Sequence, residues 1–183
     1  MEPNLLEATL AAAVKDVRTT TDEGQFLETL PEGARQRACT AIIDDRGSLF
    51  EMWNADWQFD DLPMEQIYIT TLRPGIVKGW SLHKTHEDRY FVVKGVMQLV
   101  MYDVRPDSAT CGKLFKVTLS EHNRRLVSIP AFVWHADYNV GSEDCYLLNM
   151  PTKFYDYANP DKVRLPIDTD LIPHDFGRAA RGW

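Results

Sequence analysis

The stretch GIVKGWSLHKTHEDRYFVVKG, residues 75–95, decides the fold of this chain. Its two ends, 76–83 and 89–93, are rich in β-branched and aromatic residues, so the polar run between them predicts a turn joining two short strands. Alternate residues of a strand point to the same face, and Ser81 and His83 therefore share one side. Polar side chains of two neighbouring strands are thus expected to face a common interior.

Short β-rich segments of the same kind continue on both sides of this stretch, separated by turn residues. Long helical periodicity is absent from the middle of the chain, so the pattern indicates an all-β sandwich or barrel. The expected strands are 39–43, 49–53, 65–72, 76–83, 89–93, 96–103, 113–119, 126–129, 133–138 and 145–150.

The two ends of the chain differ from this β-rich body. Asn4 can cap a short amphipathic helix with Glu7 in its first turn and apolar positions recurring as far as Val17. We expect residues 1–37 to form this helix and a connector, 38–158 the barrel, and 159–183 a proline-containing tail packed on the barrel.

The composition excludes several functional classes. A chain of 183 residues with 44% hydrophobic content can bury the core of one domain. A net charge of −7 with mixed signs offers no basic face, so nucleic acid is not expected as a partner. Three widely spaced cysteines suit a reducing compartment. With neither a signal peptide nor about 18 consecutive apolar residues, we expect a cytoplasmic protein without a membrane partner.

Two motifs resemble those of the cupin superfamily. Gly75, His83, Asp88 and Gly95 follow the spacing of the first cupin motif, with Ser81 at the place of its first histidine. The second motif runs from Pro130 through His135 to Asn139, with Phe132 replacing a customary glycine. The resemblance implies a double-stranded β-helix, that is a cupin or jelly-roll barrel, with these side chains facing its interior.

Two interpretations of the polar group remain open. Two imidazoles and a carboxylate, from His83, Asp88 and His135, form a set of ligands for a divalent transition metal that leaves positions free for substrate. Alternatively, they are polar barrel residues hydrogen-bonded to one another, with Asp88 turned to solvent beside Arg89. His86 is interpreted as an exposed turn residue.

A narrower resemblance covers residues 42–161. The chain is similar to the dTDP-4-dehydrorhamnose 3,5-epimerase family, in which a histidine base removes a proton beside a keto group and a tyrosine returns one from the other face. No metal is required in that family. The motifs that carry the resemblance are Asp45-Arg46-Gly47 with Glu51, Gln66, Gly75–Trp80, Tyr102–Arg105 with Ser108 and Thr110, Leu119–Arg125, and Ile129-Pro130 with His135.

The resemblance carries over to binding positions more fully than to reacting ones. It implies ligand-binding roles for Arg46, Glu51, Gln66 and Lys78, and a place in the pocket for His135. The base histidine falls at Ser81, a lysine at Asp88 and the tyrosine near Asn149. Ser81 and Asn149 are therefore expected to touch substrate rather than to move protons, because an unassisted serine is not basic at neutral pH.

Substitute reacting groups are available nearby. We expect His83 and His135 to act as catalytic residues and Tyr138, or else Tyr146 or Tyr155, to supply the acid. The first hypothesis is a homodimeric epimerase or isomerase without a cofactor, acting on a nucleotide-linked keto sugar or a similar anionic keto compound. The alternatives are a metal-dependent cupin enzyme and a non-catalytic ligand-binding cupin.

Overall fold

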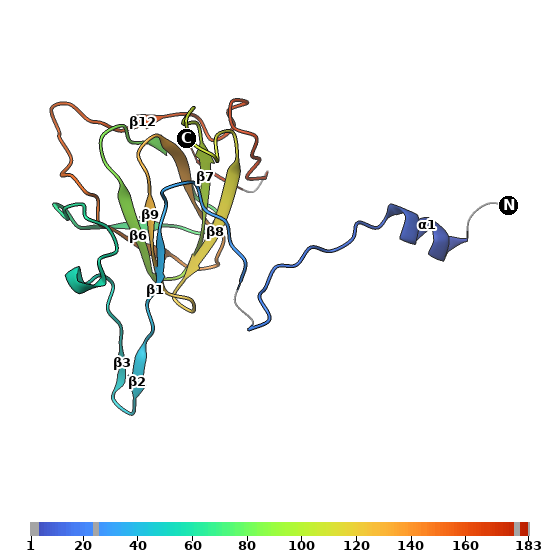
Figure 1. Ribbon diagram of the computed structural model, residues 1–183, viewed down its shortest axis with the longest axis horizontal. Coiled ribbons are helices and arrows are strands. Elements are labelled where there is room, and N and C mark those ends of the chain that lie inside the picture. Colours follow the sequence, from blue (N-terminus) through green and yellow to red (C-terminus); the bar gives the residue numbers. More distant parts are fainter. Residues whose placement is uncertain (1–3, 24–25, 178–179, 183) are drawn as a thin grey trace.

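The computed structural model describes residues 4–23, 26–177 and 180–182. Its body consists of two five-stranded antiparallel sheets, one in the order β1-β9-β6-β11-β4 and the other in the order β12-β5-β10-β7-β8 (Figure 1). The elements are α1 (Leu5–Ala12), β1 (Gln36–Ala38), β2 (Ile42–Asp44), β3 (Gly47–Leu49), a 3-10 turn (Ala55–Trp57), β4 (Tyr68–Leu72), β5 (Val77–Leu82), β6 (Asp88–Lys94), β7 (Val96–Asp103), β8 (Leu114–Ser120), β9 (Arg125–Ile129), β10 (Val133–Asn139), β11 (Cys145–Asn149) and β12 (Val163–Arg164).

The core lies between the two sheets. Strand β8 shows how it is built, because Phe115, Val117 and Leu119 are buried while the residues between them are exposed or half-buried. They pack with side chains of both sheets, among them Leu72, Val127 and Leu147. Burial of each large apolar side chain contributes about 1.5–3 kcal/mol. The expected all-β cupin-type barrel with one short helix is confirmed.

The strand prediction succeeded where apolar and polar residues alternate along the chain, and it failed for the short strands at the edges of the sheets and in the β2–β3 hairpin. Strands β4 to β11 all coincide with expected segments. The strand expected over 49–53 does not form: β3 ends at Leu49, and β2 with β3 makes a separate hairpin. Strands β1 and β12 were missed because each is a short edge strand, pairing with β9 and β5 respectively, and carries no alternation of its own.

The N-terminal helix stands apart from the barrel (Figure 1). Asn4 caps it as expected, its side chain accepting from the Glu7 amide while the Glu7 carboxylate accepts from the Asn4 amide. The helix is shorter than predicted, because Ala13 is already extended. None of its residues is buried. No helix among the described residues is long and apolar enough to cross a membrane.

The C-terminal tail covers the outer face of β5. Trp80 and Leu165 exchange backbone hydrogen bonds of 3.1 Å in both directions, and the Val77 amide donates to the Arg181 carbonyl at 2.8 Å. The Trp80 ring is fully buried beneath this tail and packs against Phe176. The tail is therefore part of the folded body and can contribute residues to the mouth of the barrel.

Two backbone positions hold β5 and β10 close together. Gly79 has a φ of +153°, and a Cβ there would lie 2.5 Å from the Ala136 Cβ, so only glycine permits this approach. Phe132, at the customary glycine position of the second motif, adopts a left-handed φ of 62°. In the resulting register Ser81 lies opposite His135.

Candidate active site

The polar cluster forms where the turn after β5 meets the start of β6. His83 Nε2 lies 3.3 Å from Asp88 Oδ2, and His135 Nε2, reaching in from β10, lies 3.6 Å from the same oxygen. The His83 and His135 rings are stacked with centroids 5.7 Å apart. The three side chains are nine-tenths or more buried. The structure thus brings together the residues that the cupin motifs placed together.

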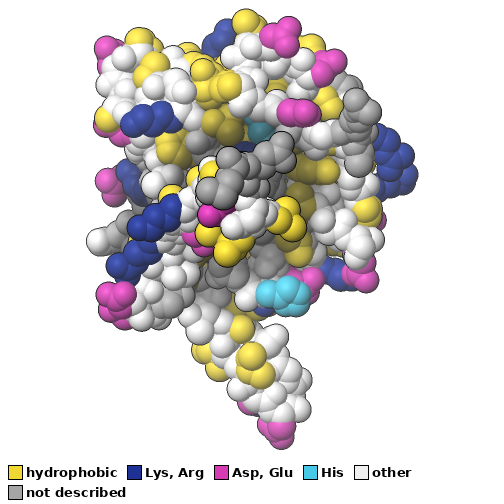
Figure 2. Space-filling model, turned by 90° about the vertical axis from the view of Figure 1, so that its right-hand side faces the viewer, with side chains coloured by type: hydrophobic (Ala, Val, Ile, Leu, Met, Phe, Trp, Pro, Cys, Tyr) yellow, Lys and Arg dark blue, Asp and Glu magenta, His cyan; other side chains and the backbone are white. Residues whose placement is uncertain are grey.

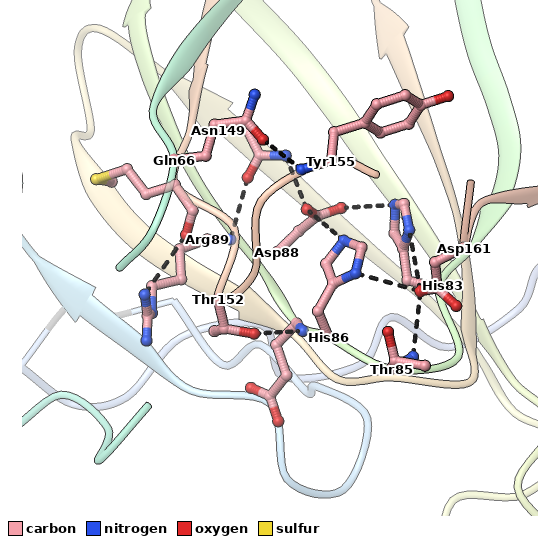
Figure 3. Close-up of polar contacts among 12 residues, drawn as sticks. Gln66, His83, Thr85, His86, Asp88, Arg89, Asn149, Thr152, Tyr155 and Asp161 are labelled. Atoms are coloured by element: carbon pink, nitrogen blue, oxygen red, sulfur yellow. Dashed lines mark hydrogen bonds and ion pairs between the residues drawn. The ribbon is translucent and has the colours of Figure 1, made fainter. Parts of the chain in front are cut away.

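Asp88 is turned inward, not toward solvent. Its Oδ1 accepts a 2.8 Å hydrogen bond from Asn149 Nδ2 (Figure 3). Burial would raise the pKa of Asp88, but the hydrogen bond and charge of His83 and the neighbouring His135 and Asn149 outweigh it and hold that pKa well below its usual range. Arg89 is also buried, and its Nε donates to Asp60 Oδ2 at 2.7 Å. The alternative with Asp88 exposed beside Arg89 is therefore wrong.

His135 is held as a neutral imidazole. Its Nδ1 lies 3.3 Å from the Val133 carbonyl oxygen, while its Nε2 is buried without a hydrogen-bond partner. Burial lowers the pKa of His135 to about 3, because the charged ring would lose its hydration. With its hydrogen on Nδ1, toward the Val133 carbonyl, the neutral ring turns its Nε2 lone pair to Asp88.

His86 belongs to the cluster, contrary to the expectation of an exposed turn residue. Its side chain is only 9% exposed, and its ring lies 4.1 Å from that of His83, centroid to centroid. His86 Nδ1 is 3.2 Å from Asp161 Oδ2. The tail fixes this pair, because the same oxygen of Asp161 accepts from the amides of Lys84 and Thr85 at 2.9 and 3.1 Å (Figure 3).

A tyrosine hydroxyl lies beside Asn149. Tyr68 on β4 pairs in register with Asn149 on β11, and Asn149 Nδ2 donates to the Tyr68 hydroxyl at 2.8 Å. Burial and, after it, the charge of Asp88 raise the pKa of Tyr68, so the hydroxyl keeps its proton at neutral pH. The sequence analysis missed Tyr68 because its neighbour across the sheet cannot be read from chain order.

A cleft opens from this cluster toward the tail. A pocket of about 280 Å³ contains His83, His86 and Tyr68 in its lining, and an adjoining pocket of about 610 Å³ shares His86 with it. A larger hollow of about 1010 Å³ lies along residues 167–182 but contains no residue of the cluster, so we place the site in the smaller pair. The cationic side chains lining these two pockets are Lys84, Lys153, Lys162 and Arg164.

A second buried carboxyl group lies deeper in the barrel. Asp137 is two residues beyond His135 on the same face of β10, and its Oδ2 lies 3.4 Å from the Tyr90 hydroxyl. Burial raises the pKa of Asp137 to about 7, although Lys162 opposes the shift. The spacing of two from His135 was a signal that sequence analysis could have used.

Four of the expected binding residues lie in the body of the barrel. Gln66 lines the smaller pocket and accepts from the Tyr155 amide at 2.8 Å. Ser81 is buried opposite His135, and Asn149 is buried against Asp88. Lys78 is exposed and lies opposite Asp137 in the register. The charge of Lys78 acts on Asp137, which lies on the His135 face of β10, so Lys78 belongs to the side of the barrel that carries the histidines.

Arg46 and Glu51 lie away from the cleft of their own chain. The β2–β3 hairpin projects from the barrel (Figure 1 and Figure 2). Arg46 lies in the turn of this hairpin, and its side chain is 84% exposed and paired with Asp44. Glu51 follows the hairpin and accepts from Asn54 Nδ2 at 3.1 Å. Within one chain neither side chain lines the two pockets of the cleft.

The tyrosines expected to supply an acid also differ in position. Tyr138 lies among the side chains beneath the tail, its ring packed edge-on against Phe176. Tyr146 is 38% exposed on β11. Tyr155 lines both pockets of the cleft. The position of Tyr138 does not suit an acid in this site, because β10 directs it away from the face that carries His135.

Fold and site together define a barrel of the cupin class, in which His83 and His86 line a cleft that carries both cationic and acidic side chains. The family model for dTDP-4-dehydrorhamnose 3,5-epimerase matches residues 31–171. The chain belongs to this family, and it is an enzyme of the isomerase type.

Individual relatives agree with this assignment. The Haloferax volcanii protein named "Probable low-salt glycan biosynthesis epimerase Agl13" is 37% identical over 140 residues, covering 76% of this chain and 90% of that one. The Bacillus subtilis spore coat polysaccharide biosynthesis protein SpsL is 28% identical, covering 82% and 99%. The crystal structure of a dTDP sugar isomerase from Desulfovibrio desulfuricans superposes with a TM-score of 0.74 at 29% identity, covering 81% and 94%.

Proposed function

We propose that this enzyme epimerises a keto sugar carried on a nucleoside diphosphate, by removing and returning a proton beside the keto group. Membership of the epimerase family supports the reaction class. The cleft supports the substrate class, because Lys153, Lys162 and Arg164 line it and offer cationic groups to a diphosphate.

The observation that carries the proposal is the Tyr68 hydroxyl. The family resemblance places the tyrosine acid near Asn149, where this chain has an amide. Tyr68, from the neighbouring strand, brings its hydroxyl within 2.8 Å of that amide and into the lining of the pocket. A phenol is thus present almost where the family resemblance requires one, although it comes from a different position in the chain. We assign Tyr68 as the acid that returns the proton.

The base, too, comes from another position in the chain than the family resemblance implies. Ser81 cannot remove a proton without a partner of its own, whereas His86 lines both pockets and is oriented by Asp161 through Nδ1. In this assignment His86 accepts the proton from the carbon beside the keto group and Tyr68 donates one back. Exchange with water then restores both groups. The assignment replaces Tyr138 as the acid and moves the base from His83 to His86, whose ring lies 4.1 Å away, centroid to centroid.

A second copy of the chain would complete the site. The family resemblance gives Arg46 and Glu51 ligand-binding roles, yet the hairpin carries Arg46 away from its own cleft. The hairpin strands also expose Ile42, Ile43 and Leu49 by 69, 75 and 62%. We therefore keep the homodimer as part of the proposal, with this hairpin covered by the partner. Sedimentation analysis of wild-type protein and Ile43→Asp tests it, and a monomeric wild type contradicts it.

Deuterium uptake from heavy water tests the reaction. Keto sugar nucleotides incubated with the enzyme are expected to gain deuterium beside the keto group, as followed by mass spectrometry. Tyr68→Phe should slow epimerisation by about 10²–10⁴-fold because the donor hydroxyl is lost. The matched control is Tyr146→Phe, because this tyrosine of β11 is 38% exposed and lines neither pocket of the cleft, unlike Tyr155. Unchanged turnover in Tyr68→Phe would remove the assignment of the acid, and no exchange with any keto sugar nucleotide would remove the function.

A further inference from the structure

We propose that His83, Asp88 and His135 bind one divalent transition-metal ion inside the barrel. Their three ligand atoms lie within 4.8 Å of one another. Nitrogen and oxygen ligands bound at about 2.0–2.1 Å in a tetrahedral arrangement stand about 3.4 Å apart. The observed separations of 3.3 Å from His83 Nε2 and 3.6 Å from His135 Nε2 to Asp88 Oδ2 match that spacing.

The contact between His135 and Asp88 calls for a cation. With its hydrogen on Nδ1, toward the Val133 carbonyl oxygen at 3.3 Å, His135 turns the Nε2 lone pair to a carboxylate oxygen of Asp88 at 3.6 Å. Nε2 is buried and has no hydrogen-bond partner. Two electron-rich atoms that face each other away from water are unfavourable, and a bound cation converts the contact into a favourable one.

Two of the three ligands are also oriented by a hydrogen bond from behind, as is usual for metal sites. His135 has the Val133 carbonyl at Nδ1. Asp88 Oδ1, the oxygen not shared with the histidines, accepts from Asn149 Nδ2 at 2.8 Å. His83 Nδ1 has no hydrogen-bond partner, and Asp161 Oδ2 lies 3.8 Å from it. These contacts leave His83 Nε2, His135 Nε2 and Asp88 Oδ2 turned toward one another.

The ligand chemistry limits the metal. Two imidazole nitrogens with one carboxylate suit Zn²⁺, Co²⁺, Ni²⁺, Fe²⁺ or Mn²⁺ and leave coordination positions open, whereas Mg²⁺ and Ca²⁺ prefer all-oxygen sites. Among the described residues one other group, His83 with His86 and Asp161, has suitable spacing. In that group His86 Nδ1 lies 3.2 Å from Asp161 Oδ2, and the same oxygen already accepts from the amides of Lys84 and Thr85.

Metal binding itself does not depend on the identity of the substrate, but its use does rest on the proposed function. A metal ion beside the cleft floor would polarise a keto oxygen and stabilise the enolate. The chain's own part is to hold three ligands on one side and to present His83 at the pocket where the sugar would lie.

Metal analysis tests the proposal without any substrate. Wild-type protein purified without chelator, or stripped and reloaded with Zn²⁺ or Co²⁺, is expected to hold roughly one ion per chain. Elemental analysis, calorimetry and the visible spectrum of the Co²⁺ form report it. Asp88→Asn and His135→Ala should lower the stoichiometry to near zero. Asn149→Ala should weaken binding by about 10- to 100-fold, because Asp88 loses its orienting partner.

Two control variants define the site. His122→Ala removes an exposed histidine of the turn after β8 and should leave metal binding unchanged. His86→Ala should retain the ion if the proposal is right, and should lose it if the ion is held by His83, His86 and Asp161.

Two results would overturn the metal site: a stripped wild-type protein that takes up none of the five metals, or binding that Asp88→Asn does not change. The proposed function fails differently, through absence of deuterium exchange by fully loaded wild-type enzyme. Exchange that persists in metal-free enzyme would leave the epimerase assignment in place and remove the role of the ion in it.

Discussion

Two buried aspartates in this barrel have opposite surroundings. Asp103, at the end of β7, accepts from the Arg105 backbone amide and guanidinium, from the Ser108 hydroxyl at 2.6 Å and from the Thr110 hydroxyl at 2.6 Å. Asp88 instead faces the unpartnered His135 Nε2 with one of its oxygens. The carboxylate of Asp103 stabilises a turn, whereas the unpartnered His135 Nε2 beside Asp88 marks the place where an external ligand is expected.

The largest expected effect is on turnover, at a residue beside Asp88 and not beside Asp103. His86→Gln should reduce epimerisation by about 10²–10⁴-fold, because the proposed proton acceptor is lost beside the Asp88 cluster. Steady-state turnover and the melting temperature should be measured together. His122→Gln is the matched control. A His86→Gln enzyme with full turnover contradicts the assignment of the base.

Breaking the satisfied network should instead cost stability. Asp103→Ala is expected to lower the free energy of unfolding by about 2–4 kcal/mol, because Arg105 and two hydroxyl groups lose their acceptor. Urea unfolding measures the change. Turnover at temperatures well below the transition should stay close to wild type, and a large loss of turnover without loss of stability would place Asp103 in the site.

Added metal should stabilise a protein that keeps Asp88 but not one that lacks it, whereas Asp103 should make no difference to this gain. At about 100 times the dissociation constant, a bound ion stabilises the folded state by about 2.7 kcal/mol. Wild type and Asp103→Ala should both gain this increment in urea unfolding with Zn²⁺ or Mn²⁺, while Asp88→Asn should gain none. An equal gain in all three proteins would locate metal binding elsewhere.

Acid should weaken the Asp103 network in a predictable direction. Burial alone would raise the pKa of Asp103, but hydrogen bonds from Arg105, Ser108 and Thr110 lower it well below its usual value. A depressed folded-state pKa gives stability that is present above the unfolded pKa of about 3.9 and is lost as the pH falls below it. Unfolding midpoints between pH 6 and pH 3 should therefore fall less steeply in Asp103→Ala than in wild type.

The smallest expected effect lies in the loop beside the cluster. Phe132 holds a φ of 62° and its amide donates to the His83 carbonyl at 2.8 Å. Phe132→Gly relieves about 1–2 kcal/mol of left-handed backbone strain in the folded state. Against this, the more flexible unfolded chain costs about 0.5–1 kcal/mol of stability. The free energy of unfolding should rise by about 0.5 kcal/mol, as measured by urea unfolding. A clear loss would mean that the exposed ring contributes packing that outweighs the strain.

The sequence predicted the strands of the barrel wall because their apolar residues alternate, and predicted the convergence of His83, Asp88 and His135 because the cupin spacing fixes which strand faces meet. It could not predict how Tyr68 lies against Asn149, since that contact depends on sheet order. The edge strand β12 and the inward position of His86 were also missed. Both depend on the tail around Asp161, which has no periodicity of its own and is placed by contacts with β5.

The placement of the tail has a consequence for how such enzymes diversify. Asp161, Lys162 and Arg164 reach the cleft from a segment that adds only the two-residue strand β12 to the sheets. Residues that meet the ligand can therefore change in the tail while the packed interior between the sheets stays as it is. A common scaffold can in this way acquire new selectivity at little risk to its folding.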